Sequence, residues 1–364
     1  MRGGECILPA ERRDGPGEHR EGRGKNMRIL NLDGPFLIDG LQAHGHDVLS
    51  VGISGRCDTV ISHPRRAMAV YEHACATGFR PDMVLCCDSG NLPYFPGVEE
   101  LPCPTAFYSI DTYCNAWHFG YAHAFDAVFV AQKEHTPLFV AEGHRALWLP
   151  LFAKAGQDIC RNEERDIPVA FVGTLSPKNI PDRKPFLESF RKAHPLFMAT
   201  GAYVDIFNRA HIVLNQTAAS EVNFRCFEAM ACGAALLMEH SLHGLEELFI
   251  PGEHILPLYR RGNVREAVAI AAAALADPDG LAALARRGQE LVARHHTDRR
   301  RARTLLDVME PLLREKAHRR RLADLPRRRL LLSAAYGMLA EGLTAPHLRQ
   351  HAAYFLNQAR RLAS

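Results

Sequence analysis

The chain has 364 residues, of which 47% are hydrophobic and 23% are charged, an ordinary globular composition with enough length for two cores. Its net charge of +3 is too small to indicate a nucleic-acid-binding protein. The ten cysteines are scattered without a CxxC pair, which argues against zinc and small disulfide frameworks and favours reduced thiols in a cytoplasmic protein.

The N-terminal half reads as a disordered leader followed by an α/β domain. Residues 1–26 hold six glycines and alternating charges, so we expect a leader without a core or a start assigned too early, since Met27 directly precedes the first strand. Continuous apolar runs predict strands at 27–33, 46–52, 81–88, 104–111 and 126–132, with a helix at 36–44. Such runs favour a parallel sheet covered on both faces. The first domain is expected over 27–153.

Polar residues follow the strands of this domain, where parallel sheets bind ligands. Asp111 ends one strand and His118 comes seven residues later, so either side chain could act as a base toward a hydroxyl. The alternative is that both residues have structural roles, with Asp111 capping the next helix. Gly34, in "DGPF", would let a helix N-terminus approach a phosphate. The GxGxxG fingerprint is missing, which counts against an NAD enzyme.

A second α/β unit is expected over 167–303, after a polar linker. Strands are predicted at 167–176, 196–201, 211–217 and 234–240, and a helix and a further strand within 245–258. Helices are predicted at 183–193, 203–210, 264–276 and 281–295. The only Asp-x-Asp, Asp277 and Asp279, falls between two helices, which indicates a helix stop and start rather than a manganese site.

The stretch "EVNFRCFEAMACG", 221–233, carries the clearest chemistry. A helix beginning near Asn223 presents free N–H groups that attract phosphate, and Arg225 in its first turn can pair with the same anion. Glu228 lies inside an apolar run, where a carboxylate without a partner is costly. A carboxylate there can accept two hydrogen bonds from a ribose diol. The alternative is an amphipathic helix with a solvated charged face.

"FEAMACGAALLMEH" resembles the donor-binding domain of GT-B glycosyltransferases. In family-4-type enzymes a Glu, seven residues and a second Glu precede "AMACG"; the second is Glu228 here, but the first position falls on Ser220, with Glu221 one residue later. This departure is similar to the CgeB-like, spore-maturation-type branch. "FVGTLSPKNIPDRKPFL" and "FYSIDTYCNAWHFGYAHAFDAVFVAQKEH" also resemble that branch, and the resemblance covers about residues 27–304.

The resemblance implies an α/β GT-B fold with two Rossmann-like domains facing a cleft, and a hexosyltransferase-type enzyme. It implies a nucleoside-diphosphate-sugar donor, an unknown protein or glycan acceptor, and no metal or other cofactor. The second domain would hold the donor. The nucleotide-binding residues would be Gly34, Gly173, Thr174, Lys178, Arg183, Asn215, Asn223, Arg225 and Glu228, with Asp111 and His118 as catalytic candidates. Thr174 stands where the relatives carry an Arg. For Lys178 and Arg183 the alternative is that they are ordinary surface charges. For Asn215 the alternative is that it caps a turn.

Two other functions stay open: a GT-B-shaped scaffold that has lost catalysis, which the broken Glu pair allows, and a sugar-nucleotide epimerase. The last 54 residues carry 11 Lys or Arg against 3 Asp or Glu, which leaves −5 on the preceding 310. A basic helical tail is therefore expected over 304–364. It suits an anionic partner or membrane surface, or a solvated face of helices that return to the first domain.

Overall fold

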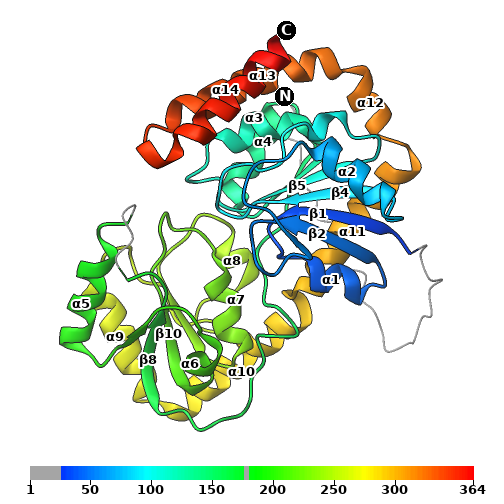
Figure 1. The fold of residues 1–364 in the computed structure, drawn as a ribbon. Helices are drawn as coiled ribbons and strands as arrows, with labels where there is room; N and C mark the ends of the chain where they lie inside the picture. Colours follow the sequence, from blue (N-terminus) through cyan, green and yellow to red (C-terminus); the bar gives the residue numbers. More distant parts are fainter. Residues whose placement is uncertain (1–25, 176–179) are drawn as a thin grey trace, which may run out of the picture.

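The structure, a computed structural model, describes residues 26–175 and 180–364 as two α/β lobes, one above the other in Figure 1. The expected leader therefore lies outside the described residues, except for Asn26. Each lobe has its own parallel sheet, seven-stranded in the first domain and four-stranded in the second.

The first sheet has the strand order β3-β2-β1-β4-β5-β6-β7, all parallel. Side chains on both faces of β1 are buried, with Ile29 in one hydrophobic cluster and Leu30 and Leu32 in another. This double burial explains the continuous apolar runs. The strands are β1 (Arg28–Asp33), β2 (Asp47–Gly52), β3 (Thr59–Val60), β4 (Met83–Cys87), β5 (Thr105–Ser109), β6 (Ala127–Val130) and β7 (Ala146–Trp148).

Short helices connect these strands, as expected for parallel pairs that need crossovers. They are α1 (Ile38–Ala43), α2 (Ala67–Ala76), η1 (Val98–Glu100), α3 (Trp117–Tyr121), η2 (Ala122–Ala124), η3 (Lys133–His135) and α4 (Thr136–Ala141).

The second sheet has the order β11-β10-β8-β9, again all parallel. Its strands are β8 (Ile167–Val172), β9 (Phe197–Ala199), β10 (Ala210–Asn215) and β11 (Ala235–Met238). Its helices are α5 (Arg183–Ala193), α6 (Val204–Arg209), α7 (Phe224–Ala231), α8 (Leu245–Leu248), α9 (Val264–Leu275) and α10 (Pro278–His295). The carboxyl ends of β8 and β10 and the start of α7 face the first domain (Figure 1).

The C-terminal helices return to the first domain, which was one of the two expectations for the tail. They are α11 (Asp298–Arg314), α12 (His318–Ala323), α13 (Leu325–Gly342), η4 (Pro346–Leu348) and α14 (Arg349–Ala363). Helix α11 packs on α1, and α13 packs on α3, so the last helices cover the first lobe (Figure 1). Leu332, Tyr336 and Phe355 complete the hydrophobic cluster on one face of the first sheet.

The two connections between the domains run side by side. Ala153 pairs with Thr297 in a parallel bridge, and the Arg301 guanidinium donates to the carbonyls of Pro150 and Leu151. Asp298 accepts the Ala155 N–H at 3.1 Å. Hydrogen bonds therefore join the outgoing and returning segments at the junction.

Some expected elements differ. The strand predicted within 245–258 is wrong: Pro251, Ile255 and Tyr259 make only isolated bridges, because Pro257 has no N–H to give a ladder. The first helix is shorter than 36–44, since Phe36 turns toward the second domain. No single helix in the described part of the chain is long and apolar enough to cross a membrane; α9 and α10 meet that test only together, across a bend of 104°.

Candidate functional site

Helix α7 forms one wall of a cavity in the second domain. The spacing of Phe224, Phe227 and Met230 predicts one buried face. Phe227 and Met230 are fully buried, which fixes the face of the helix that turns outward, whereas Phe224 is half-buried in the cavity wall. Asn223 is the N-cap residue, but its side chain makes no capping bond. It instead exchanges hydrogen bonds of 3.0 and 3.2 Å with Asn215 at the end of β10. The first turn of α7 is therefore held against the strand without a capping side chain.

Arg225 is held rigidly at the same strand ends. Its Nε donates to the Val172 carbonyl at 2.9 Å and its Nη1 to the Asn215 side chain at 2.7 Å, while the guanidinium lies 4.6 Å from the centre of the Phe171 ring. Burial lowers its pKa to about 10, so the group is still a cation at neutral pH. No hydrogen bond within residues 26–175 and 180–364 uses Nη2. That nitrogen lies over Gly173, where any Cβ would collide with it.

Glu228 faces the same cavity and is nearly desolvated. Burial raises its pKa to about 7, Asp158 adds to the rise, and the Tyr203 hydroxyl, Arg225 and Lys154 oppose it. The Tyr203 hydroxyl lies between two carboxyl groups, since it also makes a 2.7 Å hydrogen bond with Asp158, and its single proton can be donated to only one of them at a time. The pKa of Glu228 is therefore close to neutral pH, and further hydrogen bonds donated to its carboxylate would favour the ionised form.

The cavity between these groups has a volume of about 310 Å³, within the range of small-ligand sites. It lies at the carboxyl ends of β8 and β9, where such sheets bind ligands. Its lining residues are Val172, Gly173, Gly201, Tyr203, Phe207, Asn223, Phe224, Arg225 and Glu228. Five of the sequence-predicted residues are thereby at or directly behind one cavity: Gly173, Asn223, Arg225 and Glu228 in its wall and Asn215 holding Arg225.

The predicted cation Arg183 does not join this group. The Arg183 guanidinium folds back onto Gln216, with bonds of 2.8 and 3.1 Å, and onto the Thr174 carbonyl at 3.2 Å. It braces the loop after β8, and burial lowers its pKa. Thr174 contributes its backbone there. Lys178 lies outside the described residues.

The first domain presents a carboxylate toward this region. Asp88 organises the wall, because it accepts the N–H groups of Gly90, Ile110 and Asp111 at 2.8, 3.2 and 2.7 Å. Asp111 does not cap a helix, since α3 starts only at Trp117. Burial, together with the charges of Asp88 and of Glu221 from the second domain, raises the pKa of Asp111 to about 7.

Tyr113 and Glu221 complete the surroundings of Asp111. The Tyr113 hydroxyl is hydrogen-bonded to the Asp111 carboxyl. Glu221 accepts the N–H groups of Ala218 and Ala219 at 3.1 and 2.6 Å, which orders the loop before α7. Because Asp111 and Glu221 come from different domains and their charges interact, Asp111 lies near the second domain.

His118 has a different position from the one proposed for a base. It is fully buried, with Nδ1 2.8 Å from the Ser109 hydroxyl and Nε2 3.6 Å from the Asp88 carboxylate. Burial lowers its pKa to about 4. The ring packs edge-on against Phe107 and Trp117. His118 therefore supports the wall behind Asp88.

The two domains touch through specific contacts beside the cavity. Phe36 of the "DGPF" turn stacks on Phe224 of α7, with ring centres 5.2 Å apart. The Gln132 side chain pairs with the backbone of Val222 through bonds of 3.1 and 3.2 Å. Gly34 lies at the base of this turn, where a Cβ would strike Phe36 and the Asp88 carbonyl. Its role is to allow this tight turn, which places Phe36 on α7.

Several residues of the site carry no sequence signal strong enough to find them. Asp158 lies in the polar linker, and Tyr203 lies in a loop between β9 and α6. The one available hint is Gly201, which has a left-handed φ of 90° and marks a tight turn at a strand end.

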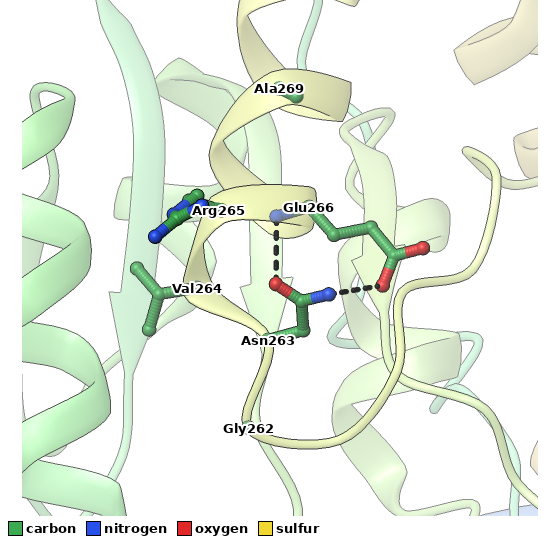
Figure 2. A pocket seen from close by; sticks show the side chains of 6 residues that line it. All are labelled: Gly262, Asn263, Val264, Arg265, Glu266 and Ala269. Atoms are coloured by element: carbon green, nitrogen blue, oxygen red, sulfur yellow. Dashed lines mark hydrogen bonds between the residues drawn. The ribbon is translucent and has the colours of Figure 1, made fainter.

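A second, larger hollow of about 740 Å³ lies at the start of α9 (Figure 2). There the Asn263 side chain accepts the Glu266 N–H at 3.2 Å and donates to the Glu266 carboxylate at 3.1 Å. Both polar groups of Asn263 are used to cap the helix. This hollow shares no lining residue with the α7 cavity, so we assign it to the helix cap.

Comparisons with known proteins show which family model and which folds the chain resembles. Residues 158–307 match the model of a family described as glycosyl transferase-like, a stretch that contains the α7 cavity and covers less than half of the chain. No curated protein matches the sequence significantly.

Solved structures share the fold. HepE of Anabaena in complex with UDP-glucose matches with a TM-score of 0.59 and 12% identity, over 79% of this chain and 100% of that one. A glycosyltransferase of Rickettsia africae matches with a TM-score of 0.57 and 9% identity, over 80% of this chain and 99% of that one. Sucrose-phosphate synthase of Thermosynechococcus elongatus matches with a TM-score of 0.57 and 13% identity, over 79% of this chain and 100% of that one. The chain has the GT-B fold with added C-terminal helices, which confirms the predicted fold class.

Proposed function

We propose that this protein is a glycosyltransferase that takes a sugar, of hexosyl type, from a nucleoside-diphosphate sugar. The observation that carries the proposal is the α7 cavity, which combines a buried carboxyl, Glu228, with the unused Nη2 of Arg225 and an uncapped helix N-terminus. The GT-B fold supports it, as do the family match over the same residues and the neighbour HepE, solved with UDP-glucose. The CgeB-like branch stays a prediction.

In this proposal each group of the cavity meets one part of the donor. The Glu228 carboxylate accepts hydrogen bonds from the ribose hydroxyls, because it is the carboxylate of the cavity lining. The diphosphate lies at the start of α7, where the helix N–H groups and Arg225 meet its charge. The Gly201–Tyr203 turn bounds the space left for the base.

The transfer step then uses the first domain. The acceptor hydroxyl oxygen forms a bond to the anomeric carbon while the bond from that carbon to the diphosphate oxygen breaks. The electron pair leaves with the diphosphate, whose charge Arg225 stabilises. The hydroxyl proton passes to Asp111, whose pKa of about 7 suits a general base at neutral pH.

We propose that the protein's own cations, without a metal ion, stabilise the negative charge of the leaving diphosphate. Among residues 26–175 and 180–364 no group of three or more His, Cys, Asp or Glu side chains could hold a metal ion. Lys178 is proposed as a further cation at the diphosphate. The acceptor is proposed to be a hydroxyl-bearing protein or glycan.

Calorimetric titration with UDP, GDP, ADP and dTDP, without metal, tests the donor site. We expect one nucleotide to bind, with affinity reduced at least tenfold in Glu228→Gln and in Arg225→Gln, since hydrogen bonds to charged groups are worth about 1.5–3 kcal/mol. Glu188→Gln, on the solvent side of α5, is the matched control and should bind as the wild type does. If no nucleotide binds, the proposed function is wrong. If one binds but its sugar nucleotides are neither hydrolysed nor transferred, the scaffold alternative is correct.

A further inference from the structure

A basic cavity of about 340 Å³ lies far from the α7 site, between the first sheet and the returning helices. Asp126 and Arg145, which line it, come just before β6 and β7, so the cavity is at the amino ends of these strands. The proposed donor site faces the carboxyl ends. The full lining is Phe125, Asp126, Ala127, Val128, Gly143, His144, Arg145, Leu312, Ala317, Arg320, Arg321 and Arg328.

The charge of this lining is strongly unbalanced, with four arginines against one carboxylate. That carboxylate is already neutralised, because Asp126 forms a buried ion pair with Arg321. Arg321 also donates to the carbonyls of Glu99, Leu101 and Cys103, so it is fixed in place. The remaining three guanidinium groups, on Arg145, Arg320 and Arg328, therefore face the cavity without an acid in its wall.

The donors of these three arginines are only partly used. Arg320 donates to Glu315, an exposed residue outside the lining, at 3.1 Å. Arg328 donates through Nη1 to the His123 and Phe125 carbonyls, and its buried Nε makes no hydrogen bond but lies 3.6 Å from the carboxylate of Asp324, which is outside the lining. Within the described ranges, the Arg145 side chain makes no hydrogen bond or ion pair.

A second buried group without a partner lies in the same wall. The Nε2 atom of His144 is buried and makes no hydrogen bond, while its ring is hydrogen-bonded to the backbone of Phe119. Burial, together with the charges of His123 and Arg328, lowers the pKa of His144 to about 4. An anion beside Nε2 would reverse this effect, since a nearby negative charge favours the protonated imidazole.

We propose that this cavity binds a phosphate or diphosphate group. Three arginines on separate segments offer the forked donors that match phosphate oxygens, and the cavity volume lies at the small end of ligand sites. Because Arg145 belongs to the first sheet and Arg320 and Arg328 to helices α12 and α13, a bound anion ties the returning helices to the sheet. The phosphate is supplied either by a free anion or by a lipid headgroup.

Titration of the full chain with inorganic phosphate and pyrophosphate tests the proposal. The Arg145→Gln/Arg320→Gln variant should bind pyrophosphate at least tenfold more weakly than the wild type, because it loses charge-assisted donors. Arg319→Gln, on the neighbouring exposed position of α12, is the matched control and should bind normally. In the wild type, NMR titration should show the pKa of His144 rising from about 4 when pyrophosphate is present.

Other outcomes decide the question as clearly. Binding that is lost in Arg225→Gln but kept in the Arg145→Gln/Arg320→Gln variant puts the anion in the α7 cavity and overturns the proposal. An equal loss in Arg319→Gln, an unmoved His144 or no binding of any probe also overturns it. Vesicles of neutral lipid with phosphatidic acid separate the sources: binding to them with an Arg145 dependence, but not to free phosphate, identifies a headgroup.

Discussion

The buried carboxyl of Glu228 should cost the folded protein stability, and Glu228→Gln should reveal that cost. Its pKa rises from an ordinary 4.5 to about 7 in the fold. A carboxyl with a raised pKa favours the protonated form in the folded state, so the penalty is small below pH 4.5 and grows as pH rises toward the folded pKa. At about 1.4 kcal/mol per pKa unit, the penalty reaches about 3 kcal/mol at pH 8 and is under about 1 kcal/mol at pH 5.

The measurement is the free energy of unfolding in urea at pH 5 and pH 8, for the wild type and Glu228→Gln. The advantage of the variant should be about 2 kcal/mol larger at pH 8 than at pH 5, and comparing the two pH values cancels any constant cost of the amide. Glu188→Gln serves as the surface control. An advantage that does not change with pH would refute the assignment of Glu228 as a desolvated carboxyl.

Three further predictions concern the catalytic wall, the domain contact and the returning helices. Asp111→Asn should lower turnover by about 10²–10⁴-fold with nucleotide affinity unchanged, and wild-type activity should rise with pH through about 7, as pH–rate profiles would show. Phe36→Ala removes the ring stacked on Phe224 and should cost at least about 1 kcal/mol in denaturant unfolding and expand the molecule in small-angle scattering. Arg321→Met leaves Asp126 buried and unpaired, so unfolding should be about 3–5 kcal/mol easier, with Asp126→Asn restoring part of the loss.

The sequence predicts the two sheets well because their strands are buried on both faces and read as unbroken apolar runs. Helix α7 is predicted for a related reason: Phe227 and Met230 fix its inner face, which leaves Glu228 on the cavity side. The failed strand near Ile255 shows the limit, since apolar residues alone do not supply the N–H that Pro257 lacks.

Residue roles are harder to predict than elements. Nothing in the sequence indicates that Gln216 takes up the Arg183 guanidinium, because the two are 33 positions apart. Tyr203, at the N-cap of α6, and Asp158, in the linker, come near Glu228 through tertiary folding. His118 is near Asp111 in sequence, yet α3 turns it into the core. Such partners are set by long-range packing, which spacing along the chain does not encode.

The return of the last helices also orders the way the protein is made. Domains are commonly completed in order from the N-terminus as the chain leaves the ribosome. Here one face of the first sheet stays uncovered until Leu332, Tyr336 and Phe355 have been synthesised, and Asp126 has no ion-pair partner until Arg321 has been synthesised. The second domain, lying between, can finish first. The N-terminal lobe is therefore the last to become complete, and chains interrupted before α13 leave its apolar face open to aggregation.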